Sequence, residues 1–340
     1  MNLLIRADAG LAIGTGHVMR CLALAQAVQD AGGESSFVLA QSTPAIQARL
    51  EAEHCEVCSI SCSSGSLDDA HKTIDLAKER RADWVVVDGY AFDAEYQRAL
   101  KKGDVNVLFL DDYGHAGEYA ADFVLNQNAH ASASVYGSRG PHTRVLLGPR
   151  YAMLRREFRP WRGWKRKISL GRRVLVTMGG SDPENVAGTV IEALRSMPDI
   201  EATVLVGGSS PHFERLAQAT SQFGSWLSLQ KNTAKIAEWM TWADVAIAAA
   251  GSTCWEMCLL QLPMVLIDVA ENQKPIARGL EALGAAIHLG SARDVTPEKI
   301  ATRVAGLLAS ETERSQLSER CGKLVDGLGA ERVLGELVRG

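Results

Sequence analysis

The sequence predicts an α/β protein of two Rossmann-like lobes whose parallel sheets face a central cleft. The chain has 340 residues, which is too long for one simple core and suits two domains. Strand and helix patterns alternate along the chain, as they do in parallel α/β architecture. Each half opens with a strand, a glycine-rich loop and a helix, first from residue 3 and again from residue 174.

Short apolar runs predict the strands of the first lobe, and helical spacing of apolar residues predicts its helices. The expected strands cover residues 3–6, 36–39, 56–60, 84–87, 105–110, 123–125 and 145–147. The expected helices cover residues 18–31, 44–53, 68–80 and 94–101. Gly32 and Gly33 suit the C-terminal cap of the first helix.

The periodicity breaks between residues 155 and 173, a basic segment that contains Trp161 and Trp164 and that we interpret as a linker. A nucleic-acid patch is the alternative, but a lone basic segment on an acidic chain disfavours it. The second lobe is expected to hold strands at 174–178, 203–206, 227–229, 245–248, 264–267 and 286–289, and helices at 184–196, 211–222, 234–240, 254–260, 274–283 and 297–309. Residues 311–339 predict two further helices.

These patterns divide the chain into three parts. Residues 1–160 form the N-terminal lobe with the candidate base, and residues 161–325 form the C-terminal lobe. Residues 326–340 form a C-terminal helix that can pack back on the N-terminal lobe.

Composition excludes several classes of protein. A net charge of −4 does not favour nucleic acid, and no apolar run approaches the roughly 18 residues of a membrane helix. Arg6 and Asp8 interrupt any signal peptide. Seven scattered cysteines indicate reduced thiols in a cytoplasmic protein. Cys55, Cys58 and Cys62 raise a zinc site as an alternative, but they lack a convincing fourth ligand, so no metal is expected.

His17 is the candidate catalytic base. It follows an apolar strand and the loop Gly14-x-Gly16, and it stands where a helix begins. Such loops lie at the carboxyl ends of parallel strands, where ligands bind. A helix N-terminus disfavours the positive imidazolium, so the ring tends to stay neutral and able to accept a proton. A ligand contact or a polar cap are the alternatives for a lone histidine.

The usual cofactor motifs are missing from the sequence. Met19 stands where the dinucleotide motif requires glycine, which disfavours NAD. The chain has no G-x4-G-K-[ST] motif, which disfavours a P-loop ATPase. We therefore expect no cofactor.

Gly251, Ser252 and Thr253 form the strongest signal in the second half. They follow an apolar strand and precede a helix, so backbone N–H groups and two hydroxyls can bind a diphosphate. Glu256, about one turn later, can accept hydrogen bonds from a ribose diol. The alternative is a capping box, in which Ser252 or Thr253 caps the helix and Glu256 completes the motif.

Other polar residues follow predicted strands. Tyr90 can hold a sugar hydroxyl or a water, or it can be a half-buried aromatic. Asn272 and Gln273 suit sugar hydroxyls or acetamido groups, or they form a polar turn. A second loop that can approach the phosphates or the sugar, or simply turn the chain, consists of Met178, Gly179, Gly180 and Ser181.

Taken together, these stretches resemble the UDP-sugar hydrolases of bacterial pseudaminic acid biosynthesis, the PseG family. The matching segments, in chain order, are Ile5-Arg6-Ala7-Asp8, Gly14-Thr15-Gly16-His17-Val18-Met19-Arg20-Cys21, Asp88-x-Tyr90, Asp111-Asp112, Asn126-Gln127-Asn128, Leu147-Gly148-Pro149-x-Tyr151, Thr177-Met178-Gly179-Gly180-Ser181-Asp182-Pro183, Gly251-Ser252-Thr253-x-Trp255-Glu256 and Asn272-Gln273. The resemblance implies a fold similar to the GT-B glycosyltransferases. It also implies metal-independent hydrolysis of UDP-2,4-diacetamido-2,4,6-trideoxy-β-L-altropyranose to UDP and the free sugar.

The resemblance further implies that His17 is the base and that Tyr90 and Asn272 lie around the sugar. We further expect water to attack the anomeric carbon with inversion, and backbone groups near residues 232–236 to contact uracil. The expected substrate-binding residues are Asp8, Gly16, Arg20, Tyr90, Met178, Gly179, Gly180, Ser181, Ile236, Gly251, Ser252, Thr253, Glu256, Asn272 and Gln273.

Three other functions fit the same residues. A GT-B glycosyltransferase would use His17 on an acceptor hydroxyl, a UDP-sugar 2-epimerase would interconvert C2 epimers, and a sensor would bind the nucleotide sugar without turnover. In each case the expected partner is a small-molecule UDP-sugar, with no nucleic acid and no membrane, and the protein is expected to be a monomer.

Overall fold

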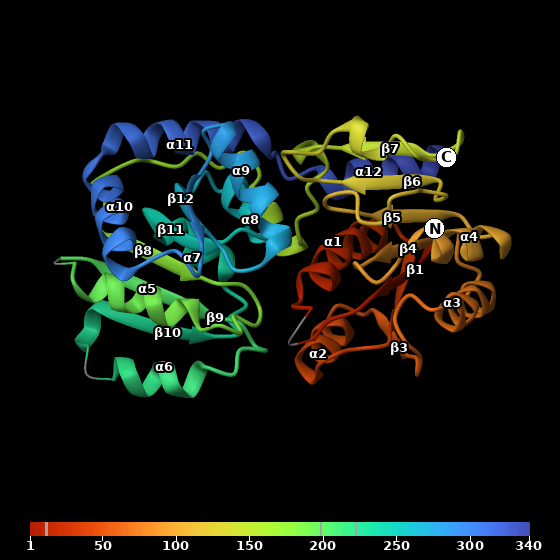
Figure 1. Cartoon of the computed structure of the whole chain (residues 1–340), viewed down its shortest axis with the longest axis horizontal. Coiled ribbons are helices and arrows are strands. Elements are labelled where there is room, and N and C mark those ends of the chain that lie inside the picture. Colours follow the sequence, from red (N-terminus) through yellow and green to blue (C-terminus); the bar gives the residue numbers. More distant parts are fainter. Residues whose placement is uncertain (11–12, 198, 222) are drawn as a thin grey trace. The chain divides into compact units, whose positions relative to one another are not determined.

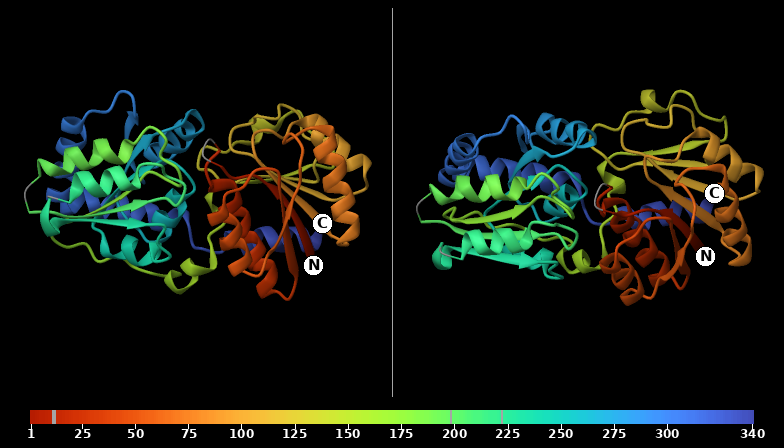
Figure 2. Two further views of the ribbon diagram at one scale, coloured as in Figure 1. Left: turned by 90° about the horizontal axis from the view of Figure 1, so that it is seen from below. Right: turned by 60° about the horizontal axis from the view of Figure 1, so that its bottom comes forward.

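The computed structural model describes residues 1–10, 13–197, 199–221 and 223–340 (Figure 1). The chain divides into two compact units, of which the first comprises Met1–Arg156 and Gly327–Gly340 and the second Glu157–Asp326. Each unit is an open parallel sheet with helices packed on its faces (Figure 2). The two predicted parallel-sheet lobes are confirmed, while the expected cleft stays a prediction.

The first unit contains a seven-stranded sheet in the order β3-β2-β1-β4-β5-β6-β7. Its strands are β1 (Asn2–Ala7), β2 (Glu34–Leu39), β3 (Glu56–Ser59), β4 (Trp84–Asp88), β5 (Val107–Leu110), β6 (Phe123–Asn126) and β7 (Arg144–Leu147). Its helices are α1 (Gly16–Asp30), α2 (Pro44–Ala52), α3 (Leu67–Glu79), α4 (Ala94–Lys102) and α12 (Gly329–Arg339), with short 3-10 helices η1 (Ala133–Tyr136) and η2 (Pro149–Tyr151). Another, η3 (Arg156–Trp161), spans the boundary of the units.

Alternation of side chains along β1 builds two cores in the first unit. Leu3 and Ile5 face α1, α2 and α12, while Leu4 faces α3 and α4 on the opposite side of the sheet. The order of the strands reverses between β1 and β4, and such a switch point is where open α/β sheets bind ligands. Gly32 follows α1 with a φ of 81°, a left-handed conformation that ends helices and suits glycine.

The second unit contains a six-stranded parallel sheet in the order β10-β9-β8-β11-β12-β13, with its switch point between β8 and β11. Its strands are β8 (Arg173–Thr177), β9 (Glu201–Val206), β10 (Leu227–Lys231), β11 (Val245–Ala249), β12 (Met264–Asp268) and β13 (Ile287–Ser291). Its helices are α5 (Val186–Arg195), α6 (Phe213–Thr220), α7 (Ile236–Trp242), α8 (Thr253–Leu259), α9 (Lys274–Ala282), α10 (Pro297–Ala309) and α11 (Glu311–Leu324), with η4 (Gly224–Trp226) and η5 (Glu271–Gln273).

The predicted strands and helices are present, with ends shifted by a few residues because periodicity locates boundaries poorly. The predicted end of the sixth helix at Gln222 lies outside the described residues. Helices α5 and α10 pack on one face of the second sheet, where Val190 and Val304 join the core that contains Val176.

The last helix, α12, belongs to the first unit although 170 intervening residues form the second. Val333 and Leu337 are buried in the same core as Leu22 of α1, because they lie four residues apart on one helical face. Glu336 adds an ion pair to Arg144 of β7 at 2.6 Å. This helix therefore closes the first unit (blue among the red-to-yellow elements in Figure 1).

Shortening Leu337 tests this packing. Leu337 is 2% exposed, so Leu337→Ala should lower the free energy of unfolding of the first unit by about 2–5 kcal/mol, the usual cost of a cavity. Val338 is 68% exposed, so the control Val338→Ala should change it by less than about 0.5 kcal/mol. Urea unfolding followed by hydrogen exchange in peptides of residues 1–156 measures both. Equal stability of the two variants would show that α12 does not stabilise this unit.

Candidate active site

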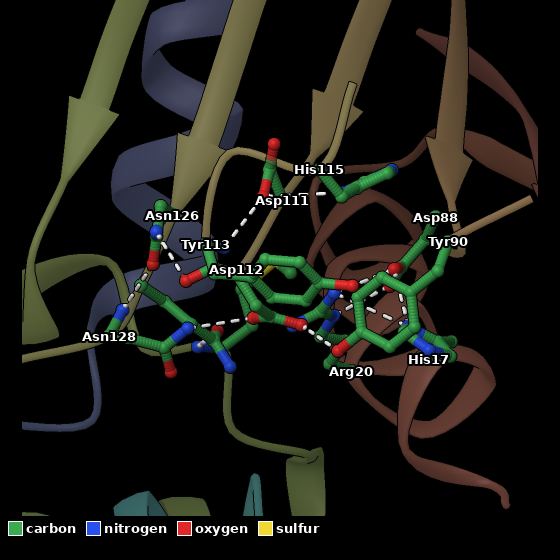
Figure 3. Close-up of polar contacts among 12 residues, drawn as sticks. His17, Arg20, Asp88, Tyr90, Asp111, Asp112, Tyr113, His115, Asn126 and Asn128 are labelled. Carbon is green, nitrogen blue, oxygen red and sulfur yellow. Dashed lines mark hydrogen bonds and ion pairs between the residues drawn. The ribbon is translucent and has the colours of Figure 1, made fainter. Parts of the chain in front are cut away.

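The switch point of the first unit brings His17 and Asp88 together. Strands β1 and β4 are paired, so the loop after β1 and the end of β4 meet at one edge of the sheet. Gly16 and His17 begin α1, and Asp88 is the last residue of β4. His17 Nδ1 lies 2.7 Å from Asp88 Oδ1, and both side chains are buried (Figure 3).

Arg20, one helical turn after His17, binds two carboxylates at once. Its Nε and Nη2 atoms lie 2.6 and 2.7 Å from the two oxygens of Asp88, and Nη1 lies 2.7 Å from Asp112 Oδ1. Burial alone would raise the pKa of Asp88, but the charge of Arg20 and the hydrogen bonds from Arg20 and His17 outweigh burial and hold that pKa well below its ordinary value. Asp88 is therefore ionised and can only accept hydrogen bonds.

The ionised Asp88 determines which nitrogen of a neutral His17 carries the proton. The 2.7 Å contact needs a donor on His17, so Nδ1 holds the proton and Nε2 keeps the lone pair. Arg20 Nη2 is farther from Nδ1, at 3.3 Å. The sequence indicated only a helix N-terminus that disfavours the imidazolium. The structure adds a carboxylate that fixes the orientation and the tautomer of the ring.

Tyr90 and Asp112 form a second pair next to His17. The Tyr90 hydroxyl donates to Asp112 Oδ2 at 2.7 Å, and its ring meets the His17 imidazole edge-on, with 4.8 Å between centroids (Figure 3). Asn128 Nδ2 donates to Asp112 Oδ1 at 2.7 Å. The predicted residues His17, Arg20 and Tyr90 are therefore in one network, in which His17 and Arg20 are buried and Tyr90 is half-buried.

Asp8, predicted to contact the substrate, is bonded within the protein. Its carboxylate accepts hydrogen bonds from the Arg6 guanidinium at 2.7 and 2.9 Å and from the Ser64 hydroxyl at 2.7 Å. It also accepts the backbone N–H groups of Ala40 and Gln41 at 2.8 and 2.9 Å. The structure thus gives Asp8 a structural role, joining the end of β1 to the loop that follows β2.

In the second unit, Gly251 and Ser252 lie between β11 and α8 at the switch point, and Thr253 is the first residue of α8. Within the described part of the chain the Ser252 side chain makes no capping hydrogen bond, so the capping box through Ser252 is not formed. Glu256 lies in the first turn of α8 and is 8% exposed. The loop has the backbone and hydroxyl groups that a diphosphate requires.

The loop after β8 lies on the other side of this switch point. It contains the predicted residues Met178, Gly179, Gly180 and Ser181. The carboxylate of Asp182 accepts the backbone N–H groups of Val186 and Ala187 at 2.8 and 3.0 Å. The N-terminus of α5 is therefore occupied by the protein's own carboxylate, which leaves only the loop itself to approach a phosphate or a sugar.

The remaining predicted residues also follow strands of the second sheet. Ile236 begins α7 after β10, and Asn272 and Gln273 lie in η5 after β12. The Gln273 Oε1 atom accepts the backbone N–H of Val269 at 3.1 Å, so this side chain stabilises its own loop. All three are half-buried. The carboxyl ends of parallel strands share one edge, which collects these loops there.

The polar network of the first unit also contains three residues that the sequence did not identify as partners of His17, Arg20 or Tyr90, namely Asp88, Asp112 and Asn128. Their position at the end of predicted strands, or directly after them, was the only sign in the sequence that they could belong to a site. The order of those strands, which the sequence does not show, decides that they meet.

Among the described residues, no group of three or more histidine, cysteine, aspartate or glutamate side chains is placed to hold a metal ion. The seven cysteines are free thiols in the structure as described. The described ranges contain no helix that combines the length and apolar character needed to cross a membrane.

Two parallel α/β units, each with ligand loops at the carboxyl edge of its sheet, define a protein of GT-B fold. The chain has this fold in common with MurG of Acinetobacter baumannii, with a TM-score of 0.67 at 15% identity over 100% of this chain and 99% of that chain. At this identity the similarity shows the fold alone.

Sequence comparison identifies a matching domain family and relatives of the chain. Residues 173–325 match the glycosyltransferase family 28 C-terminal domain. The chain is 27% identical to the spore coat polysaccharide biosynthesis protein SpsG of Bacillus subtilis, over 98% of this chain and 96% of that protein. It is 26% identical to the UDP-2,4-diacetamido-2,4,6-trideoxy-beta-L-altropyranose hydrolase of Campylobacter jejuni, over 84% of this chain and 97% of that protein. The resemblance to the UDP-sugar hydrolases of pseudaminic acid biosynthesis is confirmed.

The loop after β5, which leads to Asp112, is anchored by Asp111. The Asp111 carboxylate accepts the backbone N–H groups of Tyr113 and Gly114, each at 2.8 Å, and the hydroxyl of Tyr119. Burial works to raise the pKa of Asp111, but bonds from His115 and the other donors outweigh it and lower the pKa to about 2.

This lowered pKa predicts a pH-dependent contribution to stability. The pKa of Asp111 falls from 3.8 to about 2 on folding, so the ionised group stabilises the fold above about pH 4 and loses this effect toward pH 2. Urea unfolding should show a difference between wild type and Asp111→Asn that shrinks by on the order of 2 kcal/mol between pH 5 and pH 2. A difference that stays constant over this range would contradict the lowered pKa.

Proposed function

We propose that this protein hydrolyses UDP-2,4-diacetamido-2,4,6-trideoxy-β-L-altropyranose to UDP and the free sugar, a step of pseudaminic acid biosynthesis. The observation that carries this proposal is the buried His17–Asp88 pair at the switch point of the first unit. A histidine oriented by a carboxylate is the arrangement of a general base. Similarity to the Campylobacter jejuni hydrolase supports the substrate.

The second unit binds the nucleotide in this proposal. Gly251, Ser252 and Thr253 offer backbone N–H groups and hydroxyls to the diphosphate, and Glu256 accepts hydrogen bonds from the ribose diol. Backbone groups at Ile236 contact uracil. The match of residues 173–325 to a glycosyltransferase C-terminal domain supports this assignment.

Other side chains hold the sugar. The amide groups of Asn272 and Gln273 suit the acetamido substituents, because an amide can both donate and accept a hydrogen bond. In this proposal the backbone of Gly179, Gly180 and Ser181 approaches the sugar or the phosphates, and the space beside the Cα atom of Gly179 is open.

In the proposed chemical step, one proton moves from water to His17, and the anomeric carbon exchanges its bond to UDP for a bond to the water oxygen. His17 Nε2 takes a proton from water while the water oxygen forms a bond to the anomeric carbon. The bond from that carbon to the diphosphate oxygen breaks, UDP leaves, and the configuration inverts through an oxocarbenium-like state. Asp88 stabilises the imidazolium, which later returns its proton to solvent. UDP is a good leaving group, so the proposed step uses neither a protein acid nor a metal.

Glycosyl transfer is the second candidate, because residues 173–325 match a glycosyltransferase domain. In that case His17 would take the proton of an acceptor hydroxyl instead of water. UDP release would then depend on the acceptor.

Isotope labelling distinguishes these functions. We expect the purified protein to release UDP from the UDP-diacetamido sugar in ¹⁸O water without an acceptor and without added metal. The label should appear on C1 of the sugar and be absent from UDP. Absence of UDP release would point to a transferase or a sensor, and recovery of the C2 epimer still linked to UDP would point to an epimerase.

Replacing His17 tests its role in the same assay. His17→Ala should lower the rate roughly 10²- to 10⁴-fold, the usual contribution of a general base, while UDP affinity is kept. The exposed His71 on α3 provides the control, and His71→Ala should retain the wild-type rate. Near-normal turnover by His17→Ala would exclude this base.

A further inference from the structure

The hydroxyl of Tyr90 has a fixed polarity. It donates to Asp112 Oδ2 at 2.7 Å, while the ring lies edge-on to His17 at 4.8 Å between centroids (Figure 3). A phenol has one proton to donate, and this bond uses it. At any further hydrogen bond, the Tyr90 oxygen can therefore only accept.

The charge of Asp112 maintains this polarity. Burial acts to raise the pKa of Asp112, but Arg20 outweighs burial and lowers it. An ionised carboxylate has no proton, so it cannot reverse the bond and donate to Tyr90. The same arginine that ionises Asp88 beside His17 thus also ionises Asp112 beside Tyr90.

The Asp112 carboxylate is also fixed in direction. Its Oδ1 atom accepts Arg20 Nη1 and Asn128 Nδ2, both at 2.7 Å, and its Oδ2 atom accepts Tyr90. Rotation of the carboxylate would break all three bonds together. The position of the Tyr90 oxygen relative to His17 therefore depends on Asp112.

We propose that Asp112 is a positioning residue for the hydrolytic step, holding Tyr90 as a hydrogen-bond acceptor for the attacking water. The water donates one hydrogen to His17 Nε2 and the other to Tyr90 Oη, so a lone pair of its oxygen is directed at the anomeric carbon. His17 takes the first proton as the bond to carbon forms, and the second remains as the new C1 hydroxyl of the sugar. This inference rests on the proposed function, because it requires water as the nucleophile.

The chain contains a second tyrosine–aspartate pair, Tyr119 and Asp111, which does not contact His17 and therefore provides a control. The Tyr119 hydroxyl donates to the neighbouring carboxylate, Asp111, in the same loop region. The Tyr119 ring contacts Tyr136 and Phe109, with centroids 5.1 and 6.0 Å away. Tyr119→Phe therefore also removes a hydrogen bond from a tyrosine hydroxyl to a carboxylate, without changing the neighbours of His17.

Steady-state kinetics of UDP-sugar hydrolysis tests the proposal. Tyr90→Phe and Asp112→Asn should each lower kcat roughly 10- to 100-fold, with KM changed less than about threefold, because the lost bond acts on the attacking water. The double variant should be no slower than the slower single variant, since Asp112 acts through Tyr90. Tyr119→Phe should keep kcat within about twofold.

A second measurement tests the proposal without replacing Asp112, in case the Asp112→Asn variant fails to fold. Replacing Tyr90 by 3-fluorotyrosine keeps its shape but weakens its oxygen as an acceptor and strengthens it as a donor. The proposal predicts a lower kcat, and a higher kcat would show that Tyr90 donates in the reaction and would overturn it.

The outcomes separate this inference from the proposed function. Hydrolysis by the wild type together with an unchanged kcat in Tyr90→Phe, or with independent effects in the double variant, would overturn the role of Asp112 alone. Absence of UDP release from the wild type would overturn the proposed function and the role of Asp112 together.

Discussion

The arrangement of the candidate active site depends on one buried guanidinium. Arg20 of α1 bonds to Asp88 at the end of β4 and to Asp112 after β5, and these two carboxylates in turn hold His17 and Tyr90. Two buried carboxylates this close would not both ionise without the cation. Removing one partner of such a network leaves an unpaired buried charge, which costs about 3–5 kcal/mol. The contacts that join α1 to the carboxyl ends of β4 and β5 therefore also set the protonation states that the proposed mechanism requires.

Sequence patterns predicted the fold well, because alternating strands and helices with glycine loops leave few architectures other than parallel α/β units. They also placed His17 correctly at the N-terminus of the helix that follows the first strand. They did not pair it with Asp88, which lies 71 residues further along the chain. Periodicity identifies a strand, but only the order of strands in the sheet decides which strand ends meet, and that order arises from the packing of the whole unit.

Two carboxylates show why a motif residue need not be a ligand contact. Asp8 binds Arg6 and the backbone after β2, and Asp182 occupies the N-terminus of α5. Both carboxylates hold the backbone of loops that follow strands, which gives a physical reason for such residues to belong to the motif. Local sequence cannot distinguish the two roles, since a carboxylate that binds a ligand and one that binds a backbone N–H group need the same residue at the same strand end.

The tautomer of His17 tests the central claim most directly. In protein labelled with ¹⁵N-histidine, long-range ¹H–¹⁵N spectra distinguish a protonated ring nitrogen from an unprotonated one, and a His17→Gln variant assigns the signals. At a pH where the ring is neutral, the short contact with the ionised Asp88 predicts a proton on Nδ1 and a lone pair on Nε2. A neutral ring protonated on Nε2 would contradict the account, because that nitrogen could not take a proton from water.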